Sequence, residues 1–122
     1  MKIFGHPWVE SETFYSVVNI DNITKTPPNS LLEIDLLSAE FLPLLKHCQK
    51  ENLRYAVHIK SIKEAIFANS FNATFMLCEK ALAIELMPIA QNYLFDTQVI
   101  AVAREEDIEL LAKANVDGIR LT

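Results

Sequence analysis

The chain has 122 residues, of which 51% are apolar and 22% charged, a composition typical of one globular domain spanning residues 1–122. The net charge is −5 and the lysines and arginines are scattered, which argues against nucleic-acid binding because a phosphate-binding surface needs a concentrated basic patch. No apolar stretch approaches the roughly 20 residues of a membrane span, and the N-terminus lacks the apolar core of a signal peptide, so we expect a cytoplasmic protein with no membrane or nucleic-acid partner.

The first thirty residues are the least regular part of the chain. Lys2–Phe4 is a possible short strand, and Phe14–Ile20 is a stronger strand candidate. The acidic stretch between them is typical of a turn or a hairpin loop. The segment Thr26–Ser30 contains two prolines and predicts a rigid connector. We therefore expect an irregular, β-containing N-terminal segment whose strand direction the pattern leaves open.

From residue 31 onward, apolar strand-length runs alternate with segments of helical spacing. The predicted strands are Leu31–Ile34, Arg54–Ile59, Ala73–Cys78, Val99–Ala103 and Gly118–Leu121, and the predicted helices span roughly 39–51, 62–69, 80–94 and 105–114. Several strands are apolar on both faces, which favours a parallel sheet covered by helices. We predict an α/β fold of the three-layer α/β/α type, with a mainly parallel sheet of four to six strands in a Rossmann-like or flavodoxin-like arrangement.

Three of the predicted helices carry local signals. Ser61 begins a capping box with Glu64, so the serine hydroxyl is expected to accept a hydrogen bond from the Glu64 amide. Asn115 is a candidate left-handed cap after the last helix. Pro88 falls inside the segment 80–94 and predicts that this helix is kinked or split.

The scarcity of glycine excludes two common site types. Gly5 and Gly118 are the only glycines, whereas a P-loop or a dinucleotide-binding turn needs several so that the backbone can approach the phosphates. The helix–strand rhythm of residues 53–122 resembles the second half of nucleotide-binding regulatory domains of the Rossmann type. That resemblance implies the fold pattern alone, because the glycine motif is missing.

Cysteine usage points to no metal and no cofactor. Cys48 and Cys78 lie far apart in the sequence, and neither belongs to a histidine or cysteine pair with metal-ligand spacing. Free, buried thiols are favoured over a disulfide in a cytoplasmic setting.

Polar side chains at the carboxyl ends of the strands form the candidate site, since ligands gather at this edge of a parallel sheet. The catalytic candidates are His6, Asp35 and His58, because a histidine beside a carboxylate performs acid–base chemistry near neutral pH. The candidates for binding an anion are Lys60, Ser61 and Arg104. Glu79 and Lys80 follow another strand end at the same edge.

Each of these residues also has an ordinary structural explanation. Charged residues are common where a chain leaves the core, and His58 alternates with Val57 and Ile59 as a hydrogen-bonded core histidine would. Two functional hypotheses follow. The first is a non-catalytic regulatory or assembly module that forms a homodimer and binds a small anionic ligand. The alternative is a small enzyme acting on a phosphorylated or carboxylated metabolite, with His6 or His58 as acid–base and Asp35 or Glu79 orienting it.

Overall fold

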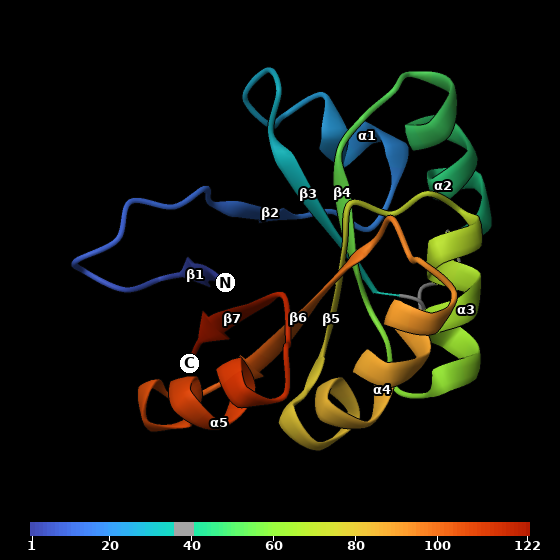
Figure 1. Ribbon diagram of the computed structural model, residues 1–122. Helices are drawn as coiled ribbons and strands as arrows, with labels where there is room; N and C mark the ends of the chain where they lie inside the picture. Colours follow the sequence, from blue (N-terminus) through green and yellow to red (C-terminus); the bar gives the residue numbers. More distant parts are fainter. Residues whose placement is uncertain (36–40) are drawn as a thin grey trace.

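Figure 1 shows the computed structural model, which describes residues 1–35 and 41–122. The strands are β1 (Lys2–Phe4), β2 (Phe14–Ser16), β3 (Leu31–Asp35), β4 (Tyr55–His58), β5 (Phe75–Glu79), β6 (Gln98–Ala103) and β7 (Gly118–Leu121). The helices are α1 (Ile20–Ile23), α2 (Phe41–Lys50), α3 (Ile62–Ser70), α4 (Lys80–Asn92) and α5 (Ile108–Lys113), with a 3-10 turn, η1 (Glu105–Asp107), leading into α5. No helix within the described ranges is long and apolar enough to cross a membrane.

The described strands form one parallel sheet in the order β1-β7-β6-β5-β4-β3-β2. This confirms the predicted α/β class and parallel sheet. The sheet has seven strands, not four to six, because both N-terminal strands join it. β1 pairs with β7 and β2 with β3, so the hairpin considered for the first strands is wrong. From β2 to β7 each connection leads to the next neighbour in the same direction, as right-handed crossovers allow.

The sheet curls strongly, so that its two edges approach each other. The rings of Phe4 on β1 and Phe14 on β2 have centroids 5.0 Å apart, although these strands lie at opposite edges. The concave face encloses a small core whose buried members all come from strands: Phe4, Leu31, Ala56, Phe75, Leu77 and Ile100. The apolar concave face is therefore buried by the curl of the sheet.

The convex face packs against helices. The buried residues of α2, α3, α4 and α5 all belong to a second, larger core cluster, which also contains Leu32 and Ile34 of β3. Neighbouring Leu31 lies in the concave core, as the period-two alternation of a strand requires. Figure 1 shows these helices arranged around the outside of the curled sheet.

Helix ends follow the local signals closely. The Ser61 hydroxyl accepts a hydrogen bond from the Glu64 amide, and the Glu64 carboxylate reaches back to the Lys60 amide. Asn115 has a φ of 63°, the left-handed conformation predicted for it. α4 runs through Pro88 without being split.

One strand boundary differs clearly from the sequence prediction, and one predicted helix start falls outside the described residues. The predicted strand Phe14–Ile20 ends at Ser16, because Asn19 caps a short helix, α1, by accepting from the Asn22 amide. Residues 39 and 40, at the start of the first predicted helical segment, lie outside the described residues, and the described helix begins at Phe41.

Candidate functional site

Three ionisable side chains meet on the concave face of the sheet. Glu33 accepts a hydrogen bond at Oε2 from His58 Nε2 (2.7 Å) and another at Oε1 from Arg120 Nη1 (2.6 Å). Glu33 lies on β3 and Arg120 on β7, with three strands between them in the sheet order. The ion pair therefore spans the hollow of the curled sheet.

These contacts keep Glu33 ionised. The hydrogen bond from His58, followed by the charge of Arg120, lowers the pKa of the Glu33 carboxyl against the opposing effect of burial. The carboxylate side chain is only 15% exposed. The Arg120 guanidinium also lies 4.8 Å from the ring centre of Phe14, so cation–π attraction helps to fix it. The cluster is thus a preorganised element of the fold.

A pocket of about 390 Å³ opens beside this cluster, at the carboxyl ends of β4, β5 and β6. Its apolar lining consists of Ile59, Leu77, Cys78, Leu82 and Val102, and its polar lining consists of His58, Lys60 and Glu79. Burial raises the pKa of the Cys78 thiol to about 12. Cys78 therefore belongs to the apolar lining of the pocket and does not act as a nucleophile.

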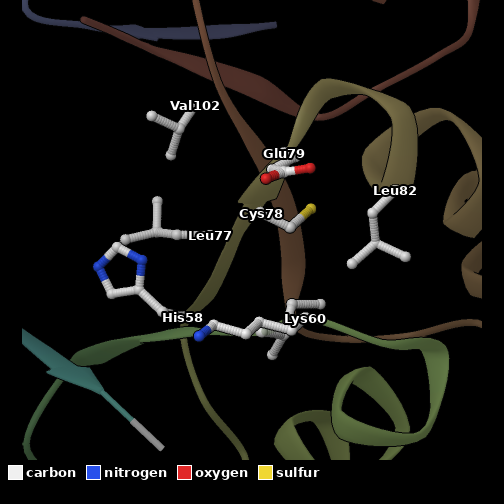
Figure 2. A pocket seen from close by; sticks show the side chains of 8 residues that line it. His58, Lys60, Leu77, Cys78, Glu79, Leu82 and Val102 are labelled. Carbon is white, nitrogen blue, oxygen red and sulfur yellow. The ribbon is translucent and has the colours of Figure 1, made fainter.

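Figure 2 shows how the polar side chains face this pocket. The His58 ring lies beside Leu77, with one nitrogen on the pocket side of the ring and the other on the far side. The Lys60 chain extends toward His58, and the Glu79 carboxylate lies on the opposite side of the pocket. Within the described residues, neither Lys60 nor Glu79 forms a side-chain ion pair. The pocket therefore has a cationic side, an anionic side and an apolar wall.

The pocket brings together three of the residues named from the sequence, His58, Lys60 and Glu79. Asp35 lies at the same edge, at the last position of β3 and opposite His58 in the strand register. Ser61 serves as the cap of α3, as described above. Arg104 lines a separate hollow beyond β6, where its side chain is 77% exposed and contacts Glu106 at 3.8 Å.

His6 is held by its own set of contacts. Its Nε2–H donates to Glu105 Oε1 (2.8 Å), and its Nδ1 accepts from the Trp8 amide (3.0 Å). Trp8 lies edge-on to the His6 ring and is 90% exposed. Both ring nitrogens of His6 are therefore occupied, and its contacts tie the segment after β1 to the start of η1.

Sequence reasoning missed Glu33 and Arg120. The available signal was a charge in the middle of an apolar strand, in Leu31–Ile34 and in Gly118–Leu121. A charged residue at such a position needs a partner. The local pattern does not show that Glu33 and Arg120 pair with each other, because the contact between them depends on the curl of the sheet.

No protein-family model matches the chain, and a search of curated proteins finds no match. Within the described ranges, no group of three or more histidine, cysteine, aspartate or glutamate side chains is arranged to hold a metal ion. The chemistry of the pocket is therefore the basis for assigning a function.

Proposed function

We propose that the protein is a regulatory or assembly module that binds a small anionic ligand with an apolar body. The observation that carries this proposal is the pocket at the carboxyl ends of β4 to β6, where Lys60 and His58 stand beside an apolar wall. Ligand sites of parallel α/β proteins form at this edge of the sheet. A volume of about 390 Å³ lies within the range of small-molecule sites.

Two features favour an acidic group on the ligand. Lys60 supplies an ammonium group that has no ion-pair partner in the described part of the chain. The first turn of α3 begins two residues after the lining residue Lys60, and the amides of a helix start carry partial positive charge. A carboxylate near Lys60 would gain a charge-assisted hydrogen bond.

The apolar wall determines the rest of the ligand. Leu77, Leu82 and Val102 contribute branched side chains to the pocket, and covering them removes apolar surface from water. A short branched fatty acid such as isocaproate meets both requirements, because it has a carboxylate at one end and an isopropyl group at the other.

The test is an NMR titration of the protein with isocaproate near neutral pH. We expect amide shifts concentrated at His58–Lys60, Leu77–Leu82 and Val102, and about tenfold weaker binding to Lys60→Met. Lys63→Met removes an exposed lysine in the first turn of α3 and is the matched control. Shifts spread over other surfaces, or equal binding by wild type and Lys60→Met, would refute the proposal.

Self-association is the second part of the proposed module. Phe67 on α3 and Tyr93 and Leu94 after α4 are 50%, 72% and 82% exposed. The two helix ends are tied together, because Asn69 Oδ1 accepts hydrogen bonds from the amides of Asp96 and Thr97. Large apolar side chains of this kind favour a homodimer contact.

The 2.7 Å hydrogen bond between His58 and Glu33 favours a second candidate, an enzyme in which His58 transfers protons. The two candidates are distinguished by incubating the protein with α-ketoisocaproate in D₂O. An acid–base site removes a proton from the carbon next to the ketone, and solvent deuterium replaces it. A binding module gives the same slow exchange as His58→Gln.

A further inference from the structure

We infer that the ligand of this pocket is a zwitterion, an amino acid or a close analogue with a branched aliphatic side chain. This inference rests on the proposed function, since it names the ligand class of the same site. The observation that carries it is the pairing of opposite charges, Lys60 and Glu79, on opposite sides of one apolar pocket.

Glu79 distinguishes a zwitterion from a simple anion. A purely anionic ligand next to Lys60 would place no positive charge near the Glu79 carboxylate, which would lose solvent without gaining a partner. A protonated amine on the same ligand supplies that partner. Binding both charges at once therefore selects against molecules that carry only one.

The neighbours of Glu79 leave its carboxylate available for an amine. Glu79 is the cap residue of α4, yet its side chain makes no capping hydrogen bond. The adjacent Lys80 does not neutralise it, because the Lys80 ammonium bonds to Asp107 Oδ1 at 3.0 Å. Glu79 thus faces the pocket with no local cation bound to it.

His58 presents one ring nitrogen to the pocket. Its other ring nitrogen, Nε2, is bonded to Glu33 Oε2 at 2.7 Å. Figure 2 shows one ring nitrogen on the pocket side of His58 and the other on the far side. Because Nε2 is the atom bonded to Glu33, the nitrogen available to the pocket is Nδ1.

The experiment compares three molecules that share one branched skeleton. L-leucine carries both charges, isocaproate lacks the amine, and isoamylamine lacks the carboxylate. In isothermal titration near neutral pH, we expect leucine to bind wild-type protein about tenfold more tightly than either single-charge analogue, because each lost charge removes a charge-assisted hydrogen bond.

A variant tests whether Glu79 is responsible for the preference for leucine. Glu79→Gln is expected to bind leucine no more tightly than isocaproate, while its affinity for isocaproate is unchanged or higher. Glu85→Gln removes an exposed carboxylate elsewhere on α4 and is expected to behave as wild type. Circular dichroism of both variants verifies that they fold.

The outcomes distinguish the zwitterion inference from the proposed anion-binding module. Equal binding of leucine and isocaproate would overturn the zwitterion inference and leave the anion-binding module standing. Absence of binding by leucine and isocaproate at millimolar concentration would overturn both. Preference for isoamylamine over leucine would also overturn both, because it would mean that Glu79 alone determines binding.

Discussion

Glu33 holds His58, one of the residues that line the pocket. It bonds to His58 on the neighbouring strand and to Arg120 across the hollow of the sheet. Because its pKa is lowered in the fold, its ionised form stabilises the folded state at pH values above the ordinary pKa of a glutamate, and this stabilisation is lost as the pH falls through the lowered pKa.

Replacing this carboxylate should have a pH-dependent effect on stability. We expect Glu33→Gln to lower the free energy of unfolding by about 1–2 kcal/mol near neutral pH, because Gln keeps the shape of the side chain and removes its charge. The difference from wild type should shrink below about pH 4. Urea denaturation at both pH values measures it, and a difference that does not depend on pH would contradict the electrostatic explanation.

Gly118 is required by close packing at the edge of the sheet. A Cβ at this position would lie 2.7 Å from Ile100 Cδ1 and 2.9 Å from the backbone oxygen of Lys2. Ile100 can shift, whereas the Lys2 oxygen belongs to β1. We expect Gly118→Ala to destabilise the fold by about 1–3 kcal/mol, measured by urea denaturation. An unchanged midpoint would mean that β1 is displaced without cost.

At the level of single residues, the sequence predicts the position of a side chain within its own strand or helix. The sequence identifies His58 and Lys60 because both lie at the carboxyl end of the same apolar strand, and the pocket brings them together. Glu33 and Arg120 were missed because their contact joins β3 to β7, which are far apart in the sequence. The two-residue alternation of a strand shows on which face of the sheet a side chain lies. It does not show which side chain it contacts across a curled sheet.

At the level of elements, α4 shows that tertiary packing outweighs local propensity. Pro88 lacks the amide hydrogen that an interior helical position donates, yet the helix continues to Asn92 with Leu86, Met87 and Ala90 buried on its inner face. The sequence pattern correctly identified a helix here, and of the two alternatives predicted for Pro88 the split is wrong, because the helix is anchored on both sides of the proline.

Removing this proline should therefore stabilise the protein. We expect Pro88→Ala to raise the free energy of unfolding by roughly 2 kcal/mol, after the greater entropy of the unfolded alanine chain is subtracted. Pro43 lies in the first turn of α2, where amides need no intrahelical acceptor. Pro43→Ala is the matched control, with an expected change within about 0.5 kcal/mol. Equal effects of the two substitutions in urea denaturation would contradict this account.

At the level of the whole molecule, the sequence pattern does not predict the number of strands or the curl of the sheet. The alternation after residue 31 correctly predicted a parallel sheet with helices. The two short N-terminal strands do not form a hairpin because each finds a longer partner, β7 or β3, at opposite edges. These pairings connect distant parts of the chain and leave no local signature.

Leu94 provides a test of self-association. It is 82% exposed and has a φ of 53°, a left-handed conformation that a leucine adopts at a cost and an asparagine adopts readily. We expect wild-type protein to sediment as a dimer at micromolar concentration and Leu94→Asn to sediment as a monomer of equal or higher stability. Leu110→Ser, which removes an exposed leucine of α5, should leave the dimer intact. A monomeric wild type would refute the assembly role.

The most direct test of the central claim, that the pocket beside His58 binds a small acidic molecule, is a crystal structure of the protein grown with saturating isocaproate. We expect the carboxylate within hydrogen-bond distance of Lys60 Nζ and the isopropyl group against Leu77 and Leu82, two of the lining residues. Isocaproate bound only at another surface, or an empty pocket at saturating concentration, would contradict it.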